Sequence, residues 1–166
     1  MLTRDKLTDA DWDVIRNTPH LVMLAVSGAG GSGLDEMLER KAGLLGIVEG
    51  MHSTLPLLRE IAGSTEIMKA QDEIRTWVHG LPDSQRTPGE MQQRALASMG
   101  RALDAIAAQG SPDDLSGYVD FVLATATRVA KAAREGDIFG IGGKLVSQDE
   151  SEFIGKLESL GRGKLG

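Results

Sequence analysis

The chain has 166 residues, of which 41% are apolar and 25% are charged, and both shares are ordinary for one globular domain. It contains no cysteine, which excludes disulfides, thiolate metal ligands and a cysteine nucleophile. The net charge is −6, with no basic cluster and no apolar run of about 20 residues, so we expect neither a nucleic-acid partner nor a membrane partner.

Helix-forming residues dominate the apolar content, since Leu, Ala and Met are frequent and aromatic residues make up only 4%. The chain begins with a polar stretch at 1–6 that lacks the features of a secretory signal, and we therefore expect a cytoplasmic protein. Seven helices are expected, at 9–17, 19–28, 34–49, 55–79, 89–109, 113–135 and 148–160.

Helix start signals recur along the chain. Each supplies a side-chain oxygen to a backbone N–H that has no partner inside its helix. Capping residues are expected at Thr8, Thr18, Thr87, Ser111 and Ser147. Proline follows Thr18 directly, and because proline is favoured at the first helical position, Thr18–Pro19 predicts a boundary between two helices.

Apolar residues spaced by three and four positions predict that these helices each bury one face. The segment 55–79 carries a broad apolar face that includes Ile61, Ile74 and Val78, with Gly63–Ser64 as a potential break within it. The alanine-rich helix 113–135 should let a neighbouring backbone approach closely. We expect an all-α bundle that forms a single domain over 1–166.

A weak internal similarity relates 22–45 to 129–160. Both stretches run from an apolar helix through a glycine-rich loop to an acidic helix start. Two helix–loop–helix repeats flanking a long helical hairpin would account for this pattern.

A glycine motif suggests a nucleotide site. Gly28, Gly30 and Gly33 match the G-x-G-x-x-G pattern that brings a backbone close to a pyrophosphate, and Glu49 lies about 20 residues further on, where a ribose ligand would be. A dinucleotide fold also needs several parallel strands, and no strand pattern follows residue 50. We favour a glycine-rich turn between two helices and keep the nucleotide site as an alternative.

A second alternative is a metal site. Glu49 and His52 have the Glu-x-x-His spacing by which helical bundles hold di-iron or di-manganese centres. Such a centre needs two of these pairs, and neither His20 nor His79 has a glutamate three residues earlier. A hydrogen-bonded or solvated His52 is the interpretation that we favour.

The glycine-rich stretch 136–144 carries three large apolar side chains, Ile138, Phe139 and Ile141. They either fold back over one end of the bundle or form an exposed apolar tip that contacts a partner.

The opening of the chain resembles a known family. The runs 11–19 and 22–26, with the acidic helix starts at 34–36 and 146–150, are similar to bacterial helical proteins related to the tellurite-resistance TerB-like fold. The resemblance implies a duplicated helical unit and a protein with no assigned activity. Where those proteins carry acidic metal-binding residues in the first loop, this chain has Ser27-Gly28-Ala29-Gly30, so no ligand is transferred.

No arrangement of a nucleophile with a base stands out in the sequence. We therefore expect a helical interaction or regulatory module rather than an enzyme, with no cofactor. A protein partner or self-association through an apolar helix face would suit such a module.

Overall fold

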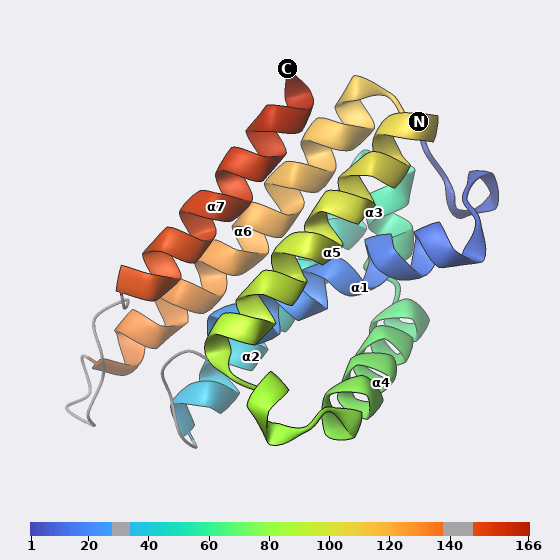
Figure 1. Cartoon of the computed structure of the whole chain (residues 1–166). Helices are drawn as coiled ribbons and strands as arrows, with labels where there is room; N and C mark the ends of the chain where they lie inside the picture. Colours follow the sequence, from blue (N-terminus) through green and yellow to red (C-terminus); the bar gives the residue numbers. More distant parts are fainter. Residues whose placement is uncertain (28–33, 138–147) are drawn as a thin grey trace.

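The computed structural model describes residues 1–27, 34–137 and 148–166, and within these ranges it contains seven α-helices, three short 3-10 helices and no strand (Figure 1). The expected all-α bundle is therefore confirmed. The α-helices are α1 (Asp9–Ser27), α2 (Leu34–Val48), α3 (Pro56–Ile61), α4 (Ser64–Gly80), α5 (Pro88–Gln109), α6 (Pro112–Asp137) and α7 (Gln148–Leu165), and the 3-10 helices are η1 (Arg4–Lys6), η2 (Glu49–His52) and η3 (Asp83–Gln85).

The expected boundary at Thr18–Pro19 is wrong, because α1 continues through Pro19. Thr18 does not cap a new helix; its hydroxyl donates to the carbonyl of Val14 at 2.7 Å, one turn earlier. Proline has no N–H for the carbonyl of Ile15, and the Tyr118 hydroxyl of α6 donates to that carbonyl instead, at 2.8 Å. A distant helix thus supplies the hydrogen bond that Pro19 removes.

The segment 55–79 divides at Gly63, as its sequence allowed, into α3 and α4. The start signals at Thr8, Thr87 and Ser111 act as expected, and Ser147 lies outside the described residues. The amide of Asp11 donates to Thr8 Oγ1 at 3.1 Å and that of Glu90 to Thr87 Oγ1 at 3.3 Å. Ser111 and Asp114 form a reciprocal capping box, with backbone-to-side-chain distances of 2.9 and 3.2 Å.

Helices α5, α6 and α7 run alongside one another, each in contact with the other two, and α1 crosses behind them (Figure 1). Helix α1 contacts α2, α4, α5 and α6, and α6 also contacts α2 and α7. Helix α4 stands to one side of the bundle, where it contacts α1 and the short α3. The consecutive pairs α1–α2 and α6–α7 are each in contact, but their loops lie outside the described residues, so the repeat relation stays a prediction.

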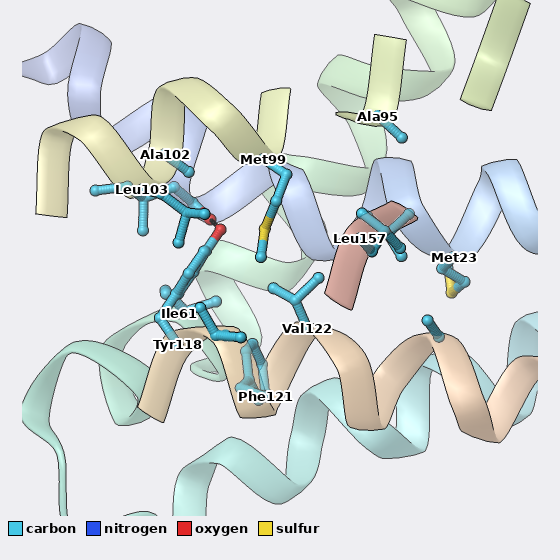
Figure 2. Close-up of a cluster of buried hydrophobic side chains, with 14 of the residues drawn as sticks. Met23, Ile61, Ala95, Met99, Ala102, Leu103, Tyr118, Phe121, Val122 and Leu157 are labelled. Carbon is cyan, nitrogen blue, oxygen red and sulfur yellow. Dashed lines mark hydrogen bonds between the residues drawn. The ribbon is translucent and has the colours of Figure 1, made fainter. Parts of the chain in front are cut away.

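The core is shared by α1, α2, α3, α5, α6 and α7. Met99 and Leu103 of α5, Tyr118 and Val122 of α6, and Leu157 of α7 converge in it (Figure 2), and all five are buried. The apolar stripes expected in 89–109 and 113–135 supply most of these side chains. Within the described ranges, none of the helices is long and apolar enough to cross a membrane.

Helices α2 and α6 approach each other closely, as the alanine content of α6 led us to expect. A Cβ added to Gly46 of α2 would lie 3.3 Å from the Cα of Thr125 in α6. One added to Gly43 would lie 2.9 Å from Val129 and 2.5 Å from Met23 of α1. The two glycines therefore allow a spacing between α2 and its neighbours that a larger residue would prevent.

Candidate functional site

Two sets of candidate residues lie outside the described ranges. Gly28, Gly30 and Gly33 belong to 28–33, and Ile138, Phe139 and Ile141 belong to 138–147. The nucleotide site and the apolar partner tip therefore stay predictions.

Glu49 and His52 both lie in η2, and both are exposed. Both carboxylate oxygens of Glu49 accept hydrogen bonds from the Arg128 guanidinium of α6, at 2.5 Å. Among the described residues there is no group of three or more His, Cys, Asp or Glu side chains that could hold a metal ion. The structure thus places Glu49 in an ion pair that joins η2 to α6.

An unexpected polar cluster lies between α1 and α4, centred on the fully buried Arg16. Its guanidinium pairs with Asp13 at 3.0 Å, with Glu66 at 3.2 Å and with Glu73. Glu66 also accepts from the Trp12 indole at 3.1 Å, and Glu73 accepts from the Asn17 amide at 3.0 Å. Every partner that a buried guanidinium needs is supplied by these two helices.

The cluster also shifts the proton equilibrium of Glu73. Burial raises the pKa of its carboxyl, but the Asn17 hydrogen bond and the charge and hydrogen bond of Arg16 outweigh burial, so the net shift is downward. Glu73 is therefore held as a carboxylate opposite Arg16.

Apart from this cluster, α4 is weakly attached. Ala70 is the one buried residue of α4. The apolar face expected over 55–79 is buried in α3, where Leu57, Leu58 and Ile61 join the core, but Ile74 and Val78 of α4 stay half-buried. Apolar packing of α4 against the core is limited to half-buried side chains such as Ile67 and Trp77, to which the polar contacts of the Arg16 cluster are added.

Two cavities flank α4, and Ile74 lines both. The first, which we call the His20 cavity, has a volume of about 400 Å³ and lies between α1, α2 and α4. The second, which we call the Trp77 cavity, has a volume of about 420 Å³ and lies between α1, α4 and α5. The His20 cavity is lined by His20, Met23, Leu24, Arg40, Leu44, Gln71, Ile74, Arg75, Val78 and His79. The Trp77 cavity is lined by Asn17, Leu21, Glu73, Ile74, Trp77, Arg94, Ala97 and Arg101.

Two charged groups of the Trp77 cavity have partners, although Nε of Arg94 is buried without one. Glu73 belongs to the Arg16 cluster, and the guanidinium of Arg94 lies over the Trp77 ring, 5.2 Å from its centroid. Arg94 also donates to the Gln85 side chain at 2.8 Å. These contacts hold α4 and α5 at the edges of the cavity.

The first cavity is lined by a buried imidazole, that of His20. Its side chain is only 2% exposed, and neither ring nitrogen has a hydrogen-bond partner among the described residues. Burial lowers the pKa of His20 to about 4, and the charge of Arg16 acts in the same direction. The imidazole is therefore neutral at pH 7, with one donor and one acceptor unused.

Three large apolar side chains form an exposed stripe on another face. Leu45 and Val48 of α2 and Met51 of η2 are 51%, 40% and 52% exposed. Their spacing of three residues places them along one side of the chain. Contact of this stripe with a protein partner or a second copy stays a prediction.

The sequence analysis missed Arg16 and His20 as site residues. Both lie on the face of α1 that also carries Trp12, Pro19 and Met23. Both occupy positions where the helical spacing predicts apolar residues. That placement was the available signal of a polar site, because charged side chains are almost never fully buried without partners. Glu66 and Glu73, which pair with Arg16, come from α4, which lies about 50 residues later in the chain.

Comparison with known proteins gives no relative: no family, no curated protein and no solved structure matches the chain. The resemblance to TerB-like proteins therefore stays a prediction.

Proposed function

We propose that this chain is a non-catalytic regulatory module that binds a small ligand in the His20 cavity, with α4 as the helix that responds to binding. The observation that carries the proposal is the buried His20, which lines a cavity of about 400 Å³ without a partner for either ring nitrogen. A buried polar group without a hydrogen bond costs about 1–3 kcal/mol, so its persistence calls for an explanation. A ligand supplies one if the residues that cover the ring shift on binding, because neither ring nitrogen has accessible surface in this structure.

The cavity has the character of a small-molecule site. Such sites have volumes of about 300–1,000 Å³ and combine apolar walls with a few polar groups that orient the ligand. Met23, Leu44 and Val78 supply apolar wall here, and His20 and Gln71 supply polar groups from two helices. This composition supports ligand recognition.

The attachment of α4 supports a regulatory role. One wall of the cavity belongs to α4, which is held on α1 mainly by the Arg16 cluster. A ligand that fills the space between α1 and α4 changes the contacts of α4 more than those of any other helix. As part of the proposal, the module acts in the cytoplasm and passes the change in α4 to a protein partner.

A thermal-shift screen of small organic molecules, metal ions and nucleotides tests the proposal. A ligand at about 100 times its Kd stabilises the native state by about 2.7 kcal/mol, which raises the Tm of a domain of this size by about 5–10 °C. We expect at least one class of small molecule to produce a shift of this order.

Two filled-cavity variants locate the binding site. Val78→Trp fills the His20 cavity and should abolish the shift, whereas Ala97→Trp fills the Trp77 cavity and should preserve it. A screen in which no compound raises the Tm, or a ligand that stabilises Val78→Trp as much as the natural chain, would contradict the proposal.

A further inference from the structure

The Trp77 cavity is lined by groups of opposite charge that come from different helices. Helix α5 supplies two guanidinium groups, those of Arg94 and Arg101, and α4 supplies the carboxylate of Glu73. Four apolar side chains make up most of the remaining wall, namely Leu21, Ile74, Trp77 and Ala97. The cavity thus combines a positive wall, a negative wall and apolar surface within a volume of about 420 Å³.

The positive wall keeps its charge after its present contacts are counted. Arg101 is exposed, and it forms neither a hydrogen bond nor an ion pair with any residue that the structure describes. Asp104, one turn later in α5, pairs with α7 instead. The two partners of Arg94, the Gln85 side chain and the Trp77 ring, are uncharged. Because Nε of Arg94 is buried, Arg101 is the cation that a ligand in the cavity can reach.

The negative wall keeps a free oxygen. The hydrogen bonds that Glu73 accepts, from the Arg16 guanidinium and from an amide of α1, both go to Oε2. Oε1 accepts none from the described residues and is not buried. In the Arg16 cluster, the carboxylates of Asp13, Glu66 and Glu73 share one guanidinium. Lys69 adds the charge of a second cation at Glu73, so three carboxylates face two cations and negative charge stays in excess.

We infer that the Trp77 cavity binds a small zwitterion, a molecule with an ammonium, a carboxylate and a short apolar body. The carboxylate pairs with Arg101, the ammonium donates to Oε1 of Glu73, and the body lies against the apolar wall. A simple anion is repelled by Glu73 and a simple cation by Arg101, so neither makes use of both walls. The volume lies within the range of small-molecule sites and accommodates a molecule of amino-acid size. This site is separate from the His20 cavity, and the inference goes beyond the proposed function.

Three probes that share one apolar body but differ in their charged groups test this inference. Isothermal titration of the full chain at pH 7 compares L-leucine, a zwitterion, with N-acetyl-L-leucine, which lacks the ammonium, and L-leucinamide, which lacks the carboxylate. We expect leucine to bind at least about 10-fold more tightly than either derivative, a difference of about 1.4 kcal/mol, because each derivative loses one charge-assisted contact.

Matched variants assign the preference to this cavity. Arg101→Gln should weaken leucine binding by about 10-fold and leave leucinamide binding unchanged, because leucinamide has no carboxylate to pair with the guanidinium. Arg75→Gln removes an exposed cation from the His20 cavity and should change neither affinity. Both arginines are exposed, so both variants should fold. Ala97→Trp fills the Trp77 cavity and should abolish leucine binding, whereas Val78→Trp fills the His20 cavity and should preserve it.

The outcomes separate this inference from the proposed function. Failure of leucine to bind, or equal affinities for leucine and its two derivatives, would overturn the zwitterion site. An unchanged leucine affinity in Arg101→Gln or in Ala97→Trp would overturn it as well. None of these results bears on the His20 cavity. Leucine binding that is lost in Ala97→Trp counts only toward the Trp77 cavity, and the proposed function is then judged by the other compounds of the thermal screen.

Discussion

A hydrogen bond from the Tyr118 hydroxyl to the Ile15 carbonyl compensates for the N–H that Pro19 lacks. The proline leaves the carbonyl of Ile15 without its helical donor, and the Tyr118 hydroxyl of α6 supplies one at 2.8 Å. Full burial raises the pKa of Tyr118, so the phenol keeps the proton that it donates. Helix α1 can therefore continue through a residue that would otherwise end or kink it.

A double-mutant cycle tests this compensation. Tyr118→Phe leaves the Ile15 carbonyl buried without a partner and should lower the free energy of unfolding by about 1–2 kcal/mol, measured by urea denaturation. In a Pro19→Ala background the new backbone N–H can bond that carbonyl, so Tyr118→Phe should cost about 1 kcal/mol less. An equal cost of Tyr118→Phe in the two backgrounds would show that the two residues act independently.

His20 makes stability depend on pH in a definite direction. Its pKa is about 4 in the folded protein, below its ordinary value of 6.5, so the unfolded chain binds a proton more readily. The contribution of neutral His20 to the free energy of unfolding is fully present above pH 6.5. It is lost as the pH falls toward 4. Between pH 7.5 and pH 5 the free energy of unfolding should fall by about 2 kcal/mol.

Two histidine-to-glutamine variants distinguish the contribution of His20 to this pH dependence from the contributions of other groups. His20→Gln removes the titrating imidazole and should flatten the pH dependence between 7.5 and 5, whereas His79→Gln, an exposed histidine of the same cavity, should retain it. Glu73, whose pKa is lowered, acts in a lower range of pH and does not obscure the comparison. A slope that persists unchanged in His20→Gln would assign it to other residues.

Among the helices, the contact between α2 and α6 depends on small residues at defined positions. An added Cβ at Gly43 would lie 2.5 Å from Cγ of Met23 and 2.9 Å from a methyl group of Val129, and both neighbours are buried in the core. Gly100 of α5, by contrast, has no atom within 4 Å of an added Cβ. Substitution by alanine is therefore expected to change the free energy of unfolding in opposite directions at Gly43 and Gly100.

Gly43→Ala should lower the free energy of unfolding by about 1–2 kcal/mol, because overpacking outweighs the gain of about 1 kcal/mol in helix propensity. Gly100→Ala should raise it by about 0.5–1 kcal/mol, since only the propensity changes. Chemical denaturation of the two variants measures both values. A stabilised Gly43→Ala protein would mean that α2 and α6 are not in close contact in solution.

The helices also show which structural features the local sequence predicts and which it does not. The caps at Thr87 and Ser111 and the stripes of α5 and α6 were predicted correctly, because each depends on residues within one or two turns. The continuity of α1 was not, because the hydroxyl that compensates for Pro19 lies 103 residues after Ile15, whose carbonyl it serves. Arg16 and His20 were missed for the same reason, since their role depends on where α4 packs.

The molecule combines a well-packed bundle with one helix, α4, that has a single buried residue. Buried apolar residues from α1, α2, α3, α5, α6 and α7 form a continuous core, to which α4 contributes only partly buried apolar side chains. A cavity lies on each side of α4, and the Arg16 cluster holds it in between. Segments with few buried contacts open locally at a lower free energy than the core, so α4 should be the first helix to open.

Native-state hydrogen exchange measures this hierarchy. The amides of α4 should exchange at a lower free energy of opening than those of α5 and α6, and with a weaker dependence on denaturant, because little surface is exposed by the opening. Glu73→Gln removes one charge from the Arg16 cluster and should speed exchange in α4 by about 10-fold, or about 1.4 kcal/mol, while exchange in α6 changes little. Asp72→Asn is the matched control, because it breaks the exposed pair with Arg75 in the same helix and should leave α4 exchange nearly unchanged. Equal protection of α4 and α5 in the natural chain would show that the polar cluster holds α4 as firmly as the apolar core holds the bundle, and α4 would then be unsuited to report ligand binding.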